Sequence, residues 1–576
     1  MNADRLLAHY DRIADAPDAI PRLRRFILDL AVRGTLVPQD PNDEPASELL
    51  KRIATEKARS GNVACVRKPA LFAAKGTDEA PFALPDTWKW VRVGDVFKYD
   101  AGAKREPKEL LPERWLLELE DIEKDTSNVL SRVRAGERSS LSTKSEFQIG
   151  DILYGKLRPY LNKVVVADEA GYSTTEIVVI RPFLELCPHY CALALRRPDF
   201  VAYVERLGRG TKMPRLRTPD ALVAFFPLPP VAEQHRIVAK VDELMALCDR
   251  LETARTAREA TRSRLTTASL ASLNAPDPDP GAFRGHALFA LDNLATLTTR
   301  PDQIKQLRQT ILNLAVRGKL TAQDPNDEPA SELLKRIAAQ RRSTATNKGV
   351  RKKQPVMPLR KASIEVPPRG WAEEPLGNLV DPKATISYGV LVPGPDVEDG
   401  IPFVRAQDLY LSDHPERPTK TIAPEVEAVY ARTRLKGGEI LLCVVGSIGK
   451  IGTVPQSWRG ANIARAVARI APVPSVSTEY LVAVLRSEET QRYFADVTRT
   501  LAQPTLNVGL IEQLPVPIPP IVEQRRIVAK VDELIALCDR LEASLTETAK
   551  ARRGLLDTLL AEALAQDQVL RREVAA

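Results

Sequence analysis

Residues 230–252 read PVAEQHRIVAKVDELMALCDRLE, and the run recurs at residues 520–542 as PIVEQRRIVAKVDELIALCDRLE, with 19 of 23 positions identical. In both copies the apolar side chains follow one another at alternating spacings of four and three residues. This spacing predicts a long helix with one apolar seam, of the kind that packs in a coiled coil. The predicted seam residues are Ile237, Val241, Leu244, Cys248, Leu251, Ile527, Val531, Leu534, Cys538 and Leu541.

The first of these helices is expected to begin after Pro229-Pro230 and to end near Leu273, where the sequence APDPDPG follows. At 1.5 Å per residue it would be roughly 60 Å long. A helix of that length cannot bury its seam alone, so the two copies are expected to pair antiparallel as a rigid strut. Self-association of two chains through the seams is the alternative.

A second repeat accompanies the first. Residues 30–54, LAVRGTLVPQDPNDEPASELLKRIA, recur at residues 314–338 with 22 of 25 positions identical. Short amphipathic helices are expected around Leu23–Leu30 and after Pro45, and again in the second copy. The segments between the repeats, 55–229 and 339–519, are similar in length but differ strongly in sequence. One near-constant frame and one divergent insert, each present twice, are the pattern expected of two different binding domains on one scaffold.

The fold expected for each insert is α/β (α+β). The run GDILYGKLRPY at Gly150 corresponds to GEILLCVVGSI at Gly438, and Pro214-Arg215-Leu216 corresponds to Pro504-Thr505-Leu506, which indicates one fold used twice. The strand candidates are 91–97, 151–154, 164–167, 177–181, 440–445, 450–454 and 466–470, and the helix candidates are 193–207 and 478–498.

The order of the frame elements predicts a circular pseudo-twofold arrangement. In the middle of the chain a long helix leads covalently into the short helices, whereas the C-terminal long helix and the N-terminal short helices could form the same module without a covalent link. The two inserts would then be separated by long antiparallel coiled-coil helices.

Composition limits the class of protein. The 576 residues are 44% hydrophobic and 27% charged, enough for several folded domains. The N-terminus has no signal-peptide pattern and no apolar run is long enough for a bilayer, so a cytoplasmic protein without membrane contact is expected. The net charge of +8 comes from residues 229–366, which hold 23 basic and 15 acidic side chains. Ten of those cations lie in 335–361, either a nonspecific DNA tether or a solvated linker.

Catalytic signatures are mostly absent from the sequence. Gly446-Ser447-Ile448-Gly449-Lys450 resembles a phosphate loop, but the residues before and after it do not match, and a tight turn between strands is expected instead. No run of the kind that holds a flipped base for N-methylation occurs. Six scattered cysteines and five histidines lack metal-ligand spacing, so no metal site is predicted. The acidic run Glu118, Glu120, Asp121 and Glu123 is expected to be a solvated face rather than a set of metal ligands.

Nucleic-acid-binding signatures are clearer. Residues 206–217, RLGRGTKMPRLR, carry five cations and no acid, and residues 154–163 alternate cations with aromatic rings. In the second insert the equivalent loop, 503–507, offers amides, which suit adenine edges where arginines suit guanine. The two inserts are therefore expected to bind different sequences. The candidate DNA-binding residues are Tyr154, Lys156, Arg158, Tyr160, Lys163, Arg209, Lys212, Arg215, Arg217, Ser447, Lys450, Asn462, Arg465, Gln503, Thr505 and Asn507.

Both repeats, together with the GEILLCVVGSIGKIG and QPTLN runs of the second insert, resemble the specificity (S) subunit of type I restriction-modification systems over essentially the whole chain. The resemblance implies two target recognition domains that each bind one half of a bipartite DNA site in the major groove. It also implies conserved helices that act as a ruler and dock two modification subunits. In such systems the modification subunits methylate adenine with S-adenosylmethionine, and restriction subunits drive translocation and cleavage with ATP and Mg.

The resemblance implies a non-catalytic chain that binds no cofactor itself. The expected regions are 1–84, N-terminal helices and linker; 85–228, first target recognition domain; 229–366, central conserved region; 367–518, second target recognition domain; and 519–576, C-terminal helix. Two dyad-related domains on a strut predict half-sites about one DNA turn, roughly 10 base pairs, apart. The alternatives are the specificity chain of a related methylate-and-cut system, a self-contained methyltransferase or nuclease, and a coiled-coil scaffold that binds only protein.

Overall fold

The structure is a computed structural model, and it divides into two compact units. Unit 1 comprises residues 1–258 and 548–576, and unit 2 comprises residues 259–547. The described residues are 15–59, 80–138, 142–207, 212–275, 280–346, 355–358, 368–498 and 504–574.

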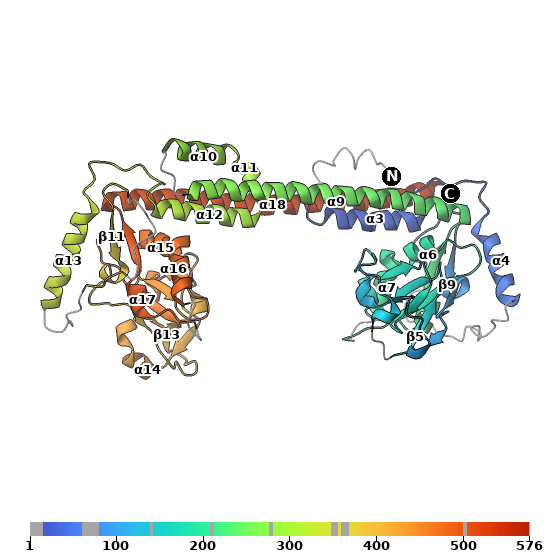
Figure 1. Ribbon diagram of the computed structural model, residues 1–576, viewed down its shortest axis with the longest axis horizontal. Helices are drawn as coiled ribbons and strands as arrows, with labels where there is room; N and C mark the ends of the chain where they lie inside the picture. The colour runs from blue at the N-terminus through green and yellow to red at the C-terminus, as the bar shows by residue number, and fades with distance from the viewer. Residues whose placement is uncertain are drawn as a thin grey trace. The chain divides into compact units, whose positions relative to one another are not determined.

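Long and short helices form the frame of each unit (Figure 1). Unit 1 contains α3 (Ala19–Arg33), α4 (Ala46–Arg59), the first part of α9 (Val231–Asn274) and the last part of α18 (Ile521–Val574). Unit 2 contains the remainder of both long helices, with α10 (Pro280–Asp292), α11 (Leu294–Leu297), α12 (Pro301–Val316) and α13 (Ala330–Thr346). The start of one long helix thus shares a unit with the end of the other, the order expected of antiparallel helices.

Two four-stranded sheets build the first insert domain. One has the order β2-β9-β6-β7 and is antiparallel throughout; the other has the order β3-β5-β8-β4, with β4 parallel to β8. A separate antiparallel pair, β1 with β10, joins the two ends of the domain. The strands are β1 (Lys89–Arg92), β2 (Phe97–Tyr99), β3 (Lys104–Arg105), β4 (Trp115–Leu117), β5 (Lys144–Phe147), β6 (Ile152–Gly155), β7 (Val164–Val166), β8 (Gly171–Ser173), β9 (Ile177–Pro182) and β10 (Phe225–Leu228). The helices are α5 (Val93–Val96), α6 (Pro188–Leu195), α7 (Pro198–Leu207) and α8 (Thr218–Leu222).

The second insert domain follows the same plan. Its main sheet has the order β12-β18-β15-β16, a second sheet has the order β14-β13-β17, and β11 pairs with β19 where the domain begins and ends. The strands are β11 (Ala372–Pro375), β12 (Ser387–Tyr388), β13 (Ile401–Val404), β14 (Lys420–Ile422), β15 (Ile440–Cys443), β16 (Ile451–Thr453), β17 (Asn462–Ile463), β18 (Val467–Ile470) and β19 (Pro515–Ile518). The helices are α14 (Pro424–Val429), α15 (Thr478–Arg486), α16 (Glu488–Thr498) and α17 (Val508–Glu512).

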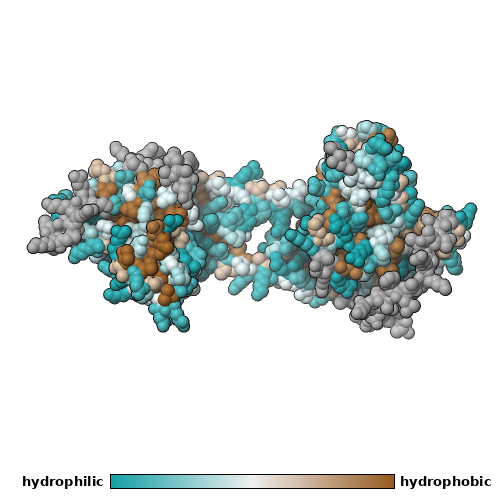
Figure 2. Space-filling model, turned by 90° about the horizontal axis from the view of Figure 1, so that it is seen from below, coloured by the Kyte–Doolittle hydropathy of each residue, from teal (hydrophilic) through white to brown (hydrophobic). Residues whose placement is uncertain are grey.

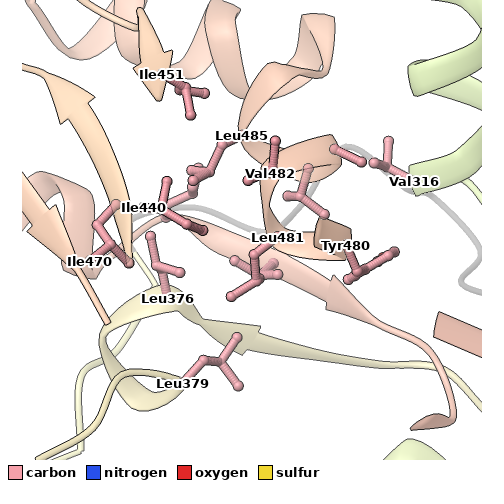
Figure 3. Packing of buried hydrophobic residues seen from close by; sticks show 14 of the residues in the cluster. Val316, Leu376, Leu379, Ile440, Ile451, Ile470, Tyr480, Leu481, Val482 and Leu485 are labelled. Carbon is pink, nitrogen blue, oxygen red and sulfur yellow. The ribbon is translucent and has the colours of Figure 1, made fainter. Parts of the chain in front are cut away.

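The core of the second insert domain continues into its frame. Figure 3 shows Ile440 and Ile470 of the main sheet packed towards Leu481 and Leu485 of α15, with Val316 of α12 nearby. All five side chains are buried in one hydrophobic cluster. The insert domain is therefore fixed to the frame helices of its own unit rather than tethered to them.

The two near-identical repeats bind each other, which explains why they are nearly the same in both halves. Glu233, in the first turn of α9, accepts hydrogen bonds from Trp88 Nε1 at 2.8 Å and from Gln39 Nε2 at 2.5 Å, and Arg236 pairs with Asp43 at 2.6 Å. The same contacts occur in unit 2 among Glu523, Trp371, Gln323, Arg526 and Asp327. We call each set of five residues a frame clamp.

Three of the five predicted seam residues in each long helix are buried, and the two leucines of each seam are half-buried. The α9 seam residues Ile237, Val241 and Cys248 share a core with Ile27 of α3 and with the first insert domain. The α18 seam packs in the same way on Ile311 and its neighbours in α12. Each seam thus packs on a short frame helix of its own unit, in addition to the antiparallel arrangement of the long helices that was expected. The short frame helices are themselves amphipathic and so can cover this apolar surface.

The expected non-covalent module is present in unit 1. Ala16 and Ala19 pack on Leu556 and Leu559 of α18, and Arg22 pairs with Asp557. In unit 2 the corresponding cluster joins Leu270 and Leu273 of α9 to Ala290 and Leu297, which follow in the same chain. The circular arrangement therefore closes through side chains in one unit and through the backbone in the other.

Most expected elements are present, with two changes. The expected strand 91–97 is interrupted by α5, because the Asp95 carboxylate accepts the Arg92 N–H at 2.9 Å and turns the chain. The expected helices 193–207 and 478–498 are each two helices, which break before Pro198 and at Ser487. The α9 bounds agree with the expected ones to within one residue at the C-terminal end.

Candidate nucleic-acid interface

In the second insert domain, four segments lie side by side at one end of the main sheet. Leu506 N–H donates to Val444 O at 3.0 Å, Val444 N–H to Ala466 O at 2.8 Å, and Arg465 N–H to Val390 O at 2.9 Å. These bonds place the segments in the order 504–507, 444–450, 464–466 and 388–392. We call this set the loop edge of the second insert domain.

The loop edge of the first insert domain has the same backbone plan. Leu216 N–H donates to Lys156 O and Lys156 N–H to Glu176 O, both at 3.0 Å, and Arg158 N–H donates to Pro214 O at 2.8 Å. The Leu157–Arg215 bridge corresponds to the Val445–Thr505 bridge. The edge comprises 156–163, 174–176 and 212–217.

The strand registers make individual positions comparable between the two edges. Gly155 opposes Ile177 as Cys443 opposes Val467, and Tyr154 opposes Val164 as Leu442 opposes Ile451. Arg215 therefore corresponds to Thr505, and Arg217 corresponds to Asn507. Arg217 directly precedes α8, and Asn507 directly precedes α17. On one backbone, the first edge presents guanidinium groups where the second presents a hydroxyl and an amide.

Comparisons with known proteins point to a single family. The family described as "Type I restriction modification DNA specificity domain" matches residues 370–551. The type I restriction enzyme EcoAI specificity subunit of Escherichia coli is 30% identical over 570 residues, which cover 94% of this chain and 93% of that one. The chain belongs to the specificity subunits of type I restriction enzymes.

Two further proteins are similar to this chain. The EcoEI specificity subunit of Escherichia coli is 29% identical, over 95% of this chain and 94% of its own. The solved HsdS subunit from Thermoanaerobacter tengcongensis is 20% identical, with a TM-score of 0.43 over 84% of this chain and 98% of that chain.

Nine of the residues predicted for DNA binding are exposed on the loop edges of this specificity subunit. They are Arg158, Tyr160, Lys212, Arg215, Arg217, Ser447, Lys450, Arg465 and Asn507. Lys156 and Thr505 lie on the same edges and are half-buried. Arg158 adopts a left-handed conformation, with φ of 49°, at the position where the second domain has Gly446. Arg209 and Gln503 lie outside the described residues.

Three predicted cations are already engaged within the protein. Lys163 donates to Leu119 O at 2.7 Å, and its counterpart Lys450 donates to Ala406 O at 3.2 Å and Gln407 O at 3.1 Å. Both lysines thereby hold a short 3-10 helix against the sheet, in 119–121 and 406–408. Arg215 pairs with Glu176 at 3.0 Å, and this contact raises the pKa of the guanidinium.

The prediction that Tyr154 and Asn462 contact DNA is wrong. Tyr154 is 3% exposed and its ring packs edge-on against Phe200, so burial raises the pKa of its hydroxyl. Asn462 is fully buried; its amide donates to Glu427 and to Tyr430 O, and its oxygen accepts from Thr433 Oγ1 at 2.7 Å. Both residue types occur in DNA interfaces, but here the sheet pleat turns them inwards.

Two features of the edges are not predictable from the sequence. Glu176 supplies a carboxylate between the cations of the first edge, and Leu391 and Val392 stand exposed on the second. A single acid within a strand-end run and an apolar pair before a proline are too common to single out. Only the pairing of segments distant in sequence brings them to the edges.

The remaining motifs have structural roles. The Gly446–Lys450 run is a turn between the antiparallel strands β15 and β16, as expected, with positive φ at Gly446 and Gly449. In the acidic run, Asp121 is 3% exposed and pairs with Arg138 at 2.6 Å, which lowers its pKa even though burial opposes the shift. Among the described residues, no group of three or more potential ligands is placed to hold a metal ion.

Part of the expected basic linker is held against the second insert domain. Within the basic run 335–361, Arg341 donates to the carbonyls of Gly377, Asn378 and Val380, so this cation fixes α13 to the second insert domain. Much of the rest of that run lies outside the described residues.

No helix in the described part of the chain is long and apolar enough to cross a membrane.

Proposed function

We propose that the chain reads a bipartite site in double-stranded DNA, with one half-site contacted by the loop edge of each insert domain. The observation that carries this proposal is the pair of edges themselves: one backbone plan presents Arg217 in one domain and Asn507 in the other. Guanidinium groups suit the O6 and N7 acceptors of guanine, and amides suit the N6 and N7 groups of adenine. The two half-sites should therefore differ in sequence.

Exposed cations on the first edge also suit the phosphate backbone. Arg158 and Lys212 are solvent-exposed and lie on the two segments that the Leu157–Arg215 bridge joins. Contacts of this kind supply affinity that falls with salt concentration. The second edge has fewer cations, so its contribution should depend less on salt and more on base contacts.

We infer that the frame docks two modification subunits, which carry S-adenosylmethionine, and that restriction subunits with ATP and Mg complete the complex. The chain itself would bind no cofactor and catalyse no reaction. It would act in the cytoplasm, together with the DNA that it binds. Its kinship with specificity subunits supports these partners. The long helices would set the spacing of the half-sites, so in-register deletion of helical turns from both should shorten the unread gap.

Sequencing of adenine methylation in cells that carry the system identifies the bipartite site and tests the proposal. The complex reconstituted with modification subunits is then titrated with duplexes altered in one half-site at a time. Arg217→Ala should relax discrimination in one half-site only, and Asn507→Ala in the other, each by about 1–3 kcal/mol. Lys89→Ala, at an exposed position on β1 away from the loop edges, is the control and should change neither.

Equal loss at both half-sites from either variant would contradict the two-domain assignment. Binding that is absent with modification subunits, or insensitive to salt, would instead favour a scaffold that binds only protein. Binding of S-adenosylmethionine by the purified chain would favour a self-contained methyltransferase.

A further inference from the structure

The loop edge of the second insert domain ends in two exposed apolar side chains. Leu391 is 56% exposed and Val392 is 72% exposed. Figure 2 shows that apolar residues, in brown, gather among polar ones on one face of this domain. An exposed apolar pair beside polar groups costs solvation free energy unless something covers it.

The backbone that presents this pair is firmly held. Val390, the preceding residue, is 1% exposed and packs with Phe403 and Ile422, and its N–H donates to Ile463 O at 2.8 Å. A Cβ atom at Gly389 would lie 1.7 Å from Ile463 O, so only glycine permits this approach. Pro393 follows directly and restricts the backbone on the other side. Leu391 and Val392 are thus presented from a fixed position.

Polar groups suited to base edges flank the pair on the same edge. Arg465 is exposed, and its N–H bonds to Val390 O at 2.9 Å. Tyr388, just before Gly389, donates its hydroxyl to Leu506 O at 2.8 Å, which ties this segment to the loop that carries Asn507. An apolar pair, a guanidinium and an amide therefore occupy one continuous edge.

The first insert domain lacks an apolar pair at the comparable place. There the chain leaves β2, passes Gly102 and presents Lys104 and Arg105, which pair with Asp100 at 3.0 Å and Glu146 at 2.8 Å. The apolar pair is thus a property of one domain and not of the shared fold. A feature confined to one of two readers is expected to serve what that reader alone recognises.

Of the groups in the major groove, one is apolar: the C5 methyl group of thymine. We propose that Leu391 and Val392 contact a pyrimidine C5 methyl group, that of a thymine, in the half-site read by the second insert domain. This inference rests on the proposed function and deepens it, because it assigns the chemistry of one base position. Arg465 and Asn507 would bind the polar edges of neighbouring bases.

The test uses the full chain reconstituted with modification subunits and duplexes that carry the site found by methylation sequencing. Each thymine of the second half-site is replaced in turn by uracil, which lacks only the methyl group. At one position affinity should fall about four-fold, the value of one buried methyl group. In Leu391→Ala/Val392→Ala, thymine and uracil at that position should bind equally.

A matched control uses an exposed apolar residue elsewhere in the domain. Val429, on α14, is 78% exposed, and Val429→Ala should keep the preference for thymine over uracil. Because Leu391 and Val392 are exposed, the double variant should fold, which circular dichroism and assembly with modification subunits verify. Duplexes with cytosine or 5-methylcytosine at the same position separate the methyl group from the rest of the base: 5-methylcytosine should bind more tightly than cytosine.

Three results would overturn the inference: no thymine in the second half-site, no position sensitive to uracil, or a sensitivity that the double variant retains. A double variant that assembles less tightly with modification subunits but keeps the thymine preference would assign the pair to a protein contact instead. Failure of the proposed function looks different, because Arg217→Ala and Asn507→Ala would then alter neither half-site.

Discussion

At the scale of single residues, the frame clamp of unit 1 holds a carboxyl group in an unusual environment. Glu233 is 1% exposed, and burial raises its pKa above the usual 4.5 despite hydrogen bonds from Trp88 and Gln39 that favour the charged form. The unfolded chain therefore binds fewer protons at this site than the folded one at mildly acidic pH. The contribution of Glu233 to stability is largest below the usual pKa and falls as pH rises towards the raised value.

Glu233→Gln should remove this pH dependence of stability. As the pH rises from about 4 to 7, the unfolding free energy of the wild type should decrease relative to that of the variant. This difference is measured by denaturant unfolding at several pH values, with hydrogen exchange in unit 1 as the readout. Glu205→Gln, at an exposed position of α7, is the control and should leave the slope unchanged; an unchanged slope in Glu233→Gln as well would contradict the assignment.

Asn462 gives a second prediction at this scale. Because Asn462→Ala removes buried hydrogen bonds to Thr433, Glu427 and Tyr430, it should destabilise the second insert domain by about 1–3 kcal/mol. Base discrimination at both half-sites should persist at temperatures where the domain is folded. Asn507→Ala should do the reverse, with altered discrimination and little change in thermal unfolding. Equal effects of the two variants on discrimination would show that burial had been misjudged.

At the scale of elements, each long helix is fixed to a short one by matching contacts. Arg24 of α3 pairs with Asp249 at 2.5 Å and Glu252 at 2.7 Å, and Arg308 of α12 pairs with Asp539 at 2.6 Å and Glu542 at 2.7 Å. These ion pairs are partly exposed and each contributes little. They fix the register of the helix pair, while the seam supplies most of the stability.

Ile237→Ala should therefore destabilise unit 1 by about 2–5 kcal/mol, since its side chain is fully buried between α3 and the first insert domain. Ile527→Ala should do the same to unit 2. Hydrogen exchange resolved by peptide locates each loss, and the prediction is that it stays within one unit. Leu247→Ala, at a position of α9 that is 42% exposed, should change stability by no more than about 0.5 kcal/mol.

Sequence patterns predicted long elements better than short ones. The α9 helix is predictable because prolines mark both ends and the 4-3 spacing runs from Ile237 to Leu251. The second sheet of the first insert domain was not foreseen: β5 buries Lys144 and Ser145, and β8 contains Gly171. Short strands with buried polar residues lack the alternation that identifies a strand. Their pairing depends on contacts between distant segments, which local pattern does not encode.

The same limit applies to the candidate site. Residue type and position in a loop located both loop edges, and the exposure of Arg217 and Asn507 agrees with that prediction. Residue type alone could not separate Tyr154 from Tyr160, because the sheet pleat decides which ring faces inwards. Leu391 and Val392 were overlooked because exposed apolar residues look like core residues in a sequence.

At the scale of the whole molecule, unit 1 depends on both ends of the chain. A chain that stops at Glu547 lacks Leu556 and Leu559, and so leaves Ala16 and Ala19 uncovered. Hydrogen exchange should show lower protection in α3 and unchanged protection in the second insert domain. Leu556→Ala should reproduce the effect in part, by about 2–5 kcal/mol. A uniform loss over both units would indicate a single cooperative structure.

The closure of unit 1 through side chains also affects the order in which a ribosome can complete the protein. Unit 2 is one continuous stretch, 259–547, and can fold as soon as that stretch has emerged. Ala16 and Ala19 of unit 1 are made before that stretch, yet Leu556 and Leu559 of α18, which cover them, are made after it. Unit 1 is therefore started before unit 2 and completed after it, and the apolar surface at Ala16 and Ala19 stays open in the nascent chain until Leu556 and Leu559 have been made.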